Sequence, residues 1–156
     1  MSEIITDIKS ILSLPLVPRQ RKYYEDLIAV AKPVKISRAH DVLDSYMLDF
    51  IEHVIKPEKK RCYRNAHLLC EAFPEMVTYC EGRANVPIPV DHAFNKVGEY
   101  YIDVTFEFAL REDPSQYDYA IFGEYTANEI SKIVRKTGFY GGYYNYLWKD
   151  KNPLEI

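Results

Sequence analysis

The chain has 156 residues, of which 47% are hydrophobic and 28% are charged, and its formal net charge is −3. This length is typical of one domain, and the hydrophobic fraction is sufficient for a single core. The mild acidity excludes a general electrostatic reason to bind nucleic acid, because such binding depends on clustered lysine and arginine side chains. We therefore expect no nucleic-acid partner, although average charge does not report on a local basic patch.

The N-terminus and the cysteines bear on compartment. The first residues include acidic side chains and lack the basic stretch and apolar run of a signal peptide. No window reaches the roughly 20 apolar residues of a membrane-spanning helix. The cysteines, Cys62, Cys70 and Cys80, are odd in number and do not resemble a disulfide framework in a chain of this length. These features predict a cytoplasmic protein without membrane association, and they leave its oligomeric state open.

The N-terminal part, residues 1–57, is predicted to be helical. Isoleucines and leucines recur at helical spacing within residues 1–14, and a short helix is expected around residues 23–30. The clearest amphipathic pattern spans residues 42–54, where the apolar side chains form one continuous stripe. Pro57 ends this helix, because proline lacks the N–H donor and clashes with the preceding turn.

The middle part, residues 58–110, is predicted to hold one helix and a hairpin. The helix begins at Cys62, after a charged loop, and ends before Pro74. The hydrophobic pattern then takes a period of two, which predicts strands at residues 77–81, 92–97 and 100–106. Because prolines cannot donate regularly to a ladder, Pro87 and Pro89 place the stretch before the second strand in a loop or at a sheet edge.

The C-terminal part, residues 111–156, is predicted to form a helix and an aromatic tail. Thr126 and Glu129 fit a capping box that opens a helix ending near Lys136. Residues 138–148, rich in tyrosine and glycine, are predicted to be strand or loop. Helices followed by a run of antiparallel strands indicate an α+β fold, and we expect the whole chain to be a single domain.

Cys62 has the surroundings of a reactive cysteine. It lies at the expected start of a helix, whose terminus presents free N–H groups and partial positive charge. Three basic residues precede it directly: Lys59, Lys60 and Arg61. Both features favour the thiolate, which is the reactive form, so Cys62 is a candidate nucleophile.

The cysteines also permit a different interpretation, a zinc site built from Cys62, Cys70, Cys80 and His92. Their spacings do not fit a compact zinc site, in which cysteine pairs lie two to four residues apart, and Cys70 falls on the expected buried face of its helix. We therefore expect no metal. We also expect no cofactor, since the glycine pair at residues 141–142 is not followed by a lysine.

His92 and Asp103 can be placed together by a hairpin argument. With a four-residue loop at residues 96–99, His92 pairs directly with Asp103, and opposed residues share a face about 5 Å apart. The acid would then orient the imidazole, as the third member of a catalytic triad does. A three-residue loop would instead place Val104 opposite His92 and move the carboxylate to the other face.

Four short segments together resemble the transglutaminase-like branch of the papain-like cysteine enzymes. They are residues 62–66 (CYRNA), 79–82 (YCEG), 92–94 (HAF) and 101–105 (YIDVT). The resemblance implies a papain-like or transglutaminase-like fold in which a helix carrying the cysteine packs on an antiparallel sheet. It further implies Cys62 as the nucleophile, His92 as general base and then acid, and Asp103 as the orienting acid.

The chain departs from that pattern at several positions. Phe94 stands where the family often has tryptophan, and Val104 where proline is common. Lys56 occupies the position at which papain-type proteases place a glutamine that stabilises the oxyanion. The candidate oxyanion donors are therefore the backbone N–H of Cys62 and the side chain of Asn65, one turn along the helix.

The chemistry expected from these residues is thiol acyl transfer. Cys62 attacks an amide or related acyl carbon, a thioester forms, and water or an amine resolves it. Three outcomes share this first half and stay open: hydrolysis (as in a thiol protease), deamidation and transamidation. The substrate also stays open, and could be a protein, a peptide or a small amide. The alternative is a non-catalytic binding module or pseudoenzyme of the same fold that uses its aromatic surface.

Overall fold

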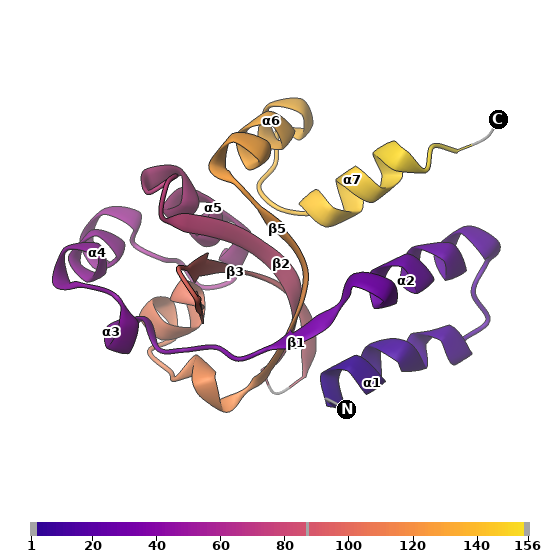
Figure 1. The fold of residues 1–156 in the computed structure, drawn as a ribbon, viewed down its shortest axis with the longest axis horizontal. Coiled ribbons are helices and arrows are strands. Elements are labelled where there is room, and N and C mark those ends of the chain that lie inside the picture. The colour runs from indigo at the N-terminus through magenta and orange to yellow at the C-terminus, as the bar shows by residue number, and fades with distance from the viewer. Residues whose placement is uncertain (1–2, 87, 155–156) are drawn as a thin grey trace.

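The computed structural model describes residues 3–86 and 88–154 of the chain. Within them, helices surround one antiparallel sheet of five strands in the order β1-β5-β2-β3-β4 (Figure 1). This arrangement confirms the α+β class predicted from the sequence. Residues 1 and 2 of the predicted first helix, and Pro87 of the predicted loop, lie outside the described residues.

The longest strands lie at the centre of the sheet. β2 pairs with β3 on one side and with β5 on the other. The strands are β1 (Lys32–Val34), β2 (Val77–Asn85), β3 (Pro89–Val97), β4 (Tyr100–Ile102) and β5 (Asp118–Tyr125).

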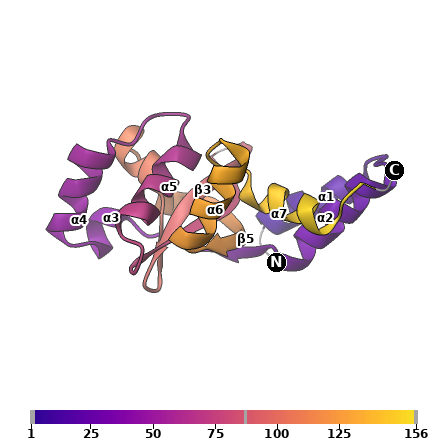
Figure 2. The same ribbon diagram turned by 90° about the horizontal axis from the view of Figure 1, so that it is seen from above.

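The helices fall into three groups in space (Figure 1, Figure 2). In both views α1, α2 and α7 lie together at one end of the molecule, α3 and α4 at the opposite end, and α5 and α6 between them. Their bounds are α1 (Glu3–Ser10), α2 (Pro18–Val30), α3 (Ala39–Val42), α4 (Ser45–Phe50), α5 (Cys62–Ala72), α6 (Ala127–Thr137) and α7 (Tyr143–Lys151). None of the described helices combines the length and the apolar character that crossing a bilayer requires.

The main core lies between α5 and the sheet. Leu69 and Cys70 of α5 pack in one buried cluster with Tyr79 of β2 and Ala93 of β3. Cys70 is fully buried, which confirms the expectation that it belongs to the core. The amphipathic pattern of α5 thus does what its sequence predicts, since it places one apolar face against the strands.

The predicted helix over residues 42–54 is wrong as a single helix. It is divided at Asp44, whose carboxylate accepts a hydrogen bond from the Met47 backbone N–H at 2.9 Å and so starts α4. α4 then continues as a π-helix, Ile51–Ile55, which ends at Lys56 in a left-handed conformation. A short acidic side chain that bonds the backbone favours a new helix start over continuation of the old one.

The C-terminal part also differs from its prediction. Residues 143–148 belong to α7 and are neither strand nor loop, and β5 and β1 were not predicted. The capping box is confirmed, since Thr126 and Glu129 bond each other's backbone N–H groups. α7 could not be predicted from the neighbouring sequence because its start is stabilised by a residue of β2. Glu81 of that strand accepts hydrogen bonds from the first N–H groups of the helix.

The β3–β4 hairpin has a tighter turn than predicted. Val97 pairs with Tyr100, so the loop contains two residues, and Gly98 supplies the positive φ of 60° that a two-residue loop with glycine first requires. The predicted direct pairing of His92 with Asp103 is therefore wrong, because β4 ends at Ile102 and Asp103 follows it. The error is two residues, and an even shift leaves Asp103 on the predicted face.

Candidate active site

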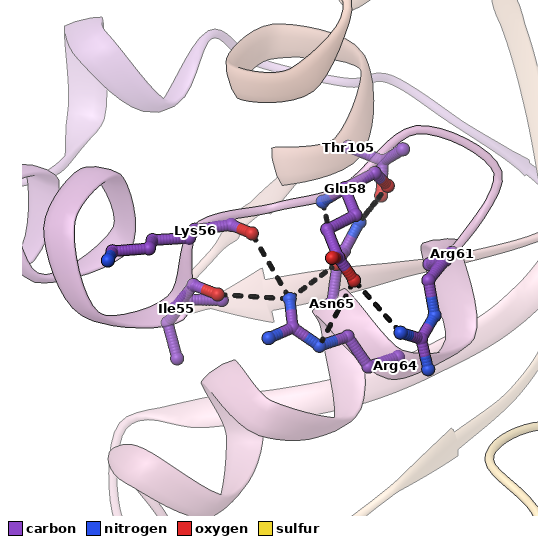
Figure 3. Close-up of polar contacts among 7 residues, drawn as sticks. All are labelled: Ile55, Lys56, Glu58, Arg61, Arg64, Asn65 and Thr105. Carbon is purple, nitrogen blue, oxygen red and sulfur yellow. Dashed lines mark hydrogen bonds and ion pairs between the residues drawn. The ribbon is translucent and has the colours of Figure 1, made fainter.

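Cys62 is the first residue of α5, and a hydrogen-bonded loop holds that helix start in place. The buried side chain of Asn65, one turn along, donates to the carbonyl oxygen of Glu58 and to the Thr105 hydroxyl, both at 2.9 Å (Figure 3). Its amide oxygen accepts from the backbone N–H of Glu58 and from Arg64, both at 3.1 Å. Asn65 therefore ties three segments together: the loop before Cys62, the helix itself, and the chain just after Asp103.

Arg64 reinforces the same loop from its other side. Its Nη1 donates to the carbonyl oxygens of Ile55, at 2.9 Å, and Lys56, at 3.2 Å (Figure 3). These two carbonyls lie at the end of the π-helix, where the chain turns toward Cys62. The start of α5 is thus anchored to the preceding helix as well as to its own loop.

The strand that carries His92 is joined directly to the helix that carries Cys62. Asn95 of β3 is fully buried, and its side-chain N–H groups donate to the carbonyl oxygen of Ala66 in α5, at 2.9 Å, and to that of Thr78 in β2, at 3.3 Å. The bond to Ala66 limits how far α5 can slide along the sheet.

His92 and Asp103 form a buried pair. The Nε2–H of His92 donates to Oδ2 of Asp103 at 2.6 Å, and the His92 side chain is 9% exposed while that of Asp103 is 0% exposed. The Asp103 carboxylate also accepts from the Tyr119 hydroxyl, at 2.5 Å, and from the Phe106 backbone N–H, at 3.1 Å. Three donors on one carboxylate hold it in a single orientation.

The two pKa values indicate that the pair is ionised. Burial by itself lowers the pKa of His92, but the charge of Asp103, the hydrogen bond to Asp103 and the nearby Cys62 outweigh burial and raise that pKa from 6.5 to about 10. Burial by itself raises the pKa of Asp103, but the His92 charge and the bonds from His92, Tyr119 and Phe106 lower it below 3.8. At neutral pH the site therefore holds an imidazolium beside a carboxylate.

Cys62 completes this arrangement. Its side chain lies near the His92 ring and contributes to the raised pKa of that histidine. Nε2 of His92 is bonded to Asp103, so Nδ1 is the ring nitrogen that Asp103 does not use. Cys62 is partly exposed, whereas Cys70 and Cys80 are buried, and none of the three forms a disulfide. The structure thus brings together the three residues selected from the sequence, with the only partly exposed cysteine of this chain next to the histidine.

The fourth sequence candidate, Asn65, is used differently. Both of its amide N–H groups already donate, one to Glu58 and the other to Thr105. In this geometry the side chain has no donor left for an oxyanion, so Asn65 acts by positioning Cys62.

Tyr119 was missed by the sequence reasoning. It lies on β5, its ring packs edge-on against His92 with the centroids 6.0 Å apart, and its hydroxyl bonds Asp103. The run of residues 119–122 has the β-branched and aromatic composition of a strand, and this signal would have indicated β5. That Tyr119 faces Asp103 depends on the sheet order and has no sequence signal.

A cavity of about 380 Å³ lies beside this centre, and His92 and Tyr63 are among the residues that line it. Within residues 3–86 and 88–154, no three His, Cys, Asp or Glu side chains gather in a way that could hold a metal ion. No protein-family model, curated protein or solved structure matches this chain significantly. The function is therefore inferred from the residues and their geometry.

Proposed function

We propose that this chain is a cysteine-dependent acyl-transfer enzyme of the transglutaminase-like and papain-like group, with Cys62, His92 and Asp103 as its catalytic triad. The observation that carries the proposal is the position of His92, which bonds Asp103 through Nε2 and lies near enough to Cys62 for the cysteine to contribute to its raised pKa. A nucleophile, a base and an orienting acid in this order are what thiol acyl transfer requires.

The first half of the reaction uses Cys62 as the nucleophile and the His92 imidazolium as the acid. The Cys62 thiolate attacks the acyl carbon of an amide, and a carbon–sulfur bond forms while the carbonyl π electrons move to oxygen. The His92 imidazolium gives its proton to the leaving nitrogen, the carbon–nitrogen bond breaks, and a thioester remains. The raised pKa of His92 supports this step, because the imidazolium is present at neutral pH to act as the acid.

The second half reverses these roles. Neutral His92 takes a proton from water or from an amine, the activated nucleophile attacks the thioester carbon, and the carbon–sulfur bond breaks to restore the thiolate. Asp103 keeps the ring oriented through both halves without taking its proton. Water yields hydrolysis or deamidation, and an amine yields transamidation.

The proposed hydrogen-bond donor to the oxyanion is a backbone N–H group. Cys62 lies in the first turn of α5, where helix N–H groups have no partner within the helix, and the positive end of the helix dipole favours negative charge there. With Asn65 already committed to the loop, the Cys62 N–H is the donor that we propose.

The family assignment is supported by the chain order of the site. A helix opens with the cysteine, the next pair of long strands brings the histidine, and the aspartate follows the hairpin, as in the pattern that the four motif segments resemble. α5 packs on the antiparallel sheet through the Asn95–Ala66 hydrogen bond. This topology is compatible with a papain-like fold in a small variant.

Acyl-enzyme formation is the direct test. The protein is incubated with 4-nitrophenyl acetate at neutral pH, and each cysteine is mapped by peptide mass spectrometry. We expect acetylation of Cys62, with Cys70 and Cys80 unmodified because they are buried. The same experiment on a His92→Ala variant is expected to show a large loss of Cys62 acetylation. Equal acetylation in both proteins would contradict the proposal and favour a non-catalytic binding module.

A further inference from the structure

The cavity beside the triad has walls of a distinct chemical kind. It lies between α2, α7 and the strands β2 and β3, and its volume of about 380 Å³ is within the range of small-molecule sites. Four tyrosines line it: Tyr23, Tyr24, Tyr63 and Tyr144. Aromatic walls of this kind receive an aromatic or aliphatic body.

The acidic groups of this wall already have partners. The Glu81 carboxylate accepts from the Tyr79 hydroxyl, at 2.5 Å, and from two backbone N–H groups at the start of α7. The Asp91 carboxylate accepts from Nη2 of Arg83 at 3.3 Å. Two acids that are both engaged argue against a site built for a cationic ligand, even though tyrosine rings attract cations.

Arg83 is the basic side chain of this wall, and its Nη2 is the atom that bonds Asp91. Its side chain is 17% exposed, and its Nε is buried and out of reach of a ligand. A ligand acceptor in the cavity would therefore bind the guanidinium through its Nη atoms. Because a guanidinium presents two parallel N–H groups, the acceptor that matches it best is a carboxylate.

The tyrosine hydroxyls add to the same preference. Burial, which is the largest cause, raises the pKa values of both Tyr23 and Tyr63. These hydroxyls stay protonated at neutral pH and can donate hydrogen bonds to an anion.

Arg83 and His92 both line this cavity. In the β2–β3 ladder Gly82 pairs with His92, and Arg83 pairs with Asp91. Because successive side chains of a strand point to opposite faces, it is the shared cavity, and not the strand register, that relates Arg83 to the proposed catalytic centre. We propose that the cavity binds an acyl substrate that carries a carboxylate and an aromatic body, with Arg83 as the specificity-determining residue; this inference rests on the proposed function of Cys62.

Gly141 keeps the Tyr63 wall in place. It has a φ of 86°, and a Cβ built there would lie 2.1 Å from Cγ of Tyr63. The backbone at 141 therefore packs directly on the Tyr63 ring, which no other residue type would permit at this position.

Binding is tested without chemistry in the Cys62→Ala variant. N-acetylphenylalanine and its neutral amide, N-acetylphenylalaninamide, are titrated separately and followed by NMR chemical shifts. We expect the acid to bind about tenfold tighter than the amide, because a charged hydrogen-bonded pair is lost in the amide. Adding Arg83→Gln should abolish this preference and Arg83→Lys should reduce it, whereas adding Arg135→Gln, an exposed arginine on α6, should retain it. All variants are first checked for folding by circular dichroism.

Equal affinity for acid and amide, or an acid preference unchanged by Arg83→Gln, would overturn the inference. Tighter binding of phenethylamine than of the acid would also overturn it, because it would mean that the tyrosine walls select a cation.

A reactive probe separates the two proposals. N-chloroacetylphenylalanine alkylates a thiolate with loss of chloride, and mapping gives the rate at each cysteine in the otherwise unchanged protein. We expect Cys62 to react faster with the acid than with the corresponding amide. Rapid alkylation of Cys62 without acid preference would refute only the inference about Arg83. Acid binding in Cys62→Ala together with an unreactive Cys62 would refute only the proposed function.

Discussion

Two histidine–carboxylate pairs in this molecule invite comparison. His92 bonds Asp103 between β3 and the end of β4, and His40 bonds Glu107 where α3 meets the π-helix Thr105–Ala109 that follows β4. In both pairs the carboxylate is buried, but the His92 side chain is 9% exposed and that of His40 is 44% exposed. Burial of the acid is therefore shared, and burial of the imidazole is not.

The remaining partners of the two acids explain the difference. Glu107 accepts from the backbone N–H groups of Ala39, at 2.6 Å, and His40, at 2.9 Å, so it stabilises the start of α3. The His40 ring stacks on Phe108. His92 instead lies near the Cys62 thiol, which contributes to the raised pKa of the histidine. Under the proposed function, this third group is what separates a catalytic histidine–carboxylate pair from a structural one.

The largest effect is expected on turnover when the proposed nucleophile or its proposed base is removed. Cys62→Ala is expected to abolish turnover while the fold persists, because alanine is accepted at a helix start. His92→Ala should cost nearly as much, on the order of a thousandfold or more, because the members of a triad act as one unit. Turnover is measured on an amide and labelled-amine panel after circular dichroism.

The matched control is His40→Ala. It should leave turnover unchanged and lower the free energy of unfolding by about 1 kcal/mol, through the lost bond to Glu107. A comparable loss of turnover in His40→Ala would show that the two pairs are not functionally distinct.

The next largest difference is expected between substitutions of the two carboxylates, Asp103 and Glu107. Asp103→Asn keeps a side chain that can bond the ring but removes the charge and favours the wrong tautomer. We expect turnover to fall by about a hundredfold to ten-thousandfold, less than for Cys62→Ala. Glu107→Gln should spare turnover and cost about 1 kcal/mol of stability, because one backbone donor of α3 loses its charged acceptor. If Glu107→Gln impaired turnover more than Asp103→Asn, the acid of the site would have been misassigned.

A pH experiment sharpens the electrostatic difference. The raised pKa of His92 means that its contribution to stability is complete below pH 6.5 and is lost as pH rises toward about 10. The lowered pKa of Asp103 means that its contribution is present above pH 3.8 and is lost as pH falls through its folded value. The difference in unfolding free energy between wild type and Asp103→Asn should therefore be largest between about pH 4 and 6.5. Denaturant titrations across pH measure it, and a difference that is independent of pH would contradict the ion pair.

The same ion pair predicts a moderate kinetic effect. At pH 6, alkylation of Cys62 by iodoacetamide should be about tenfold slower in His92→Ala than in wild type, because the sulfur loses the neighbouring imidazolium. His40→Ala should match wild type. Equal rates in all three proteins would remove the case for an imidazolium beside Cys62.

The smallest effect concerns Tyr119. Tyr119→Phe removes one of three donors to the Asp103 carboxylate and keeps the ring against His92. We expect turnover to fall by a few fold, consistent with a lost hydrogen bond of about 1 kcal/mol. The falling limb at high pH should move to higher pH, because a carboxylate with one donor fewer holds the His92 proton more strongly. A drop in turnover without any change in the pH profile would indicate a purely structural role.

Local sequence determined the pieces of this site. The charged loop after Pro57 and the amphipathic pattern beyond it indicate a helix that starts at Cys62, and they do so because helix starts and apolar faces depend on neighbours a few residues away. The period of two around His92 likewise indicates a strand. The prediction that His92 and Asp103 share a face was correct even though the predicted turn was two residues too long. Side chains alternate along a strand with a period of two, so a shift of two residues leaves the face unchanged.

Tertiary structure decided how the pieces meet. The short hairpin turn, the pairing of β5 with β2, and the approach of Tyr119 to Asp103 depend on contacts between residues distant in sequence, which no local pattern records. α7 begins where it does because Glu81, on a strand in the middle of the sheet, bonds its first N–H groups. Asn65 is the plainest example. Its position after Cys62 suggested an oxyanion donor, but in the structure the Asn65 side-chain N–H groups donate to Glu58 and Thr105. They do so because buried polar groups must be paired.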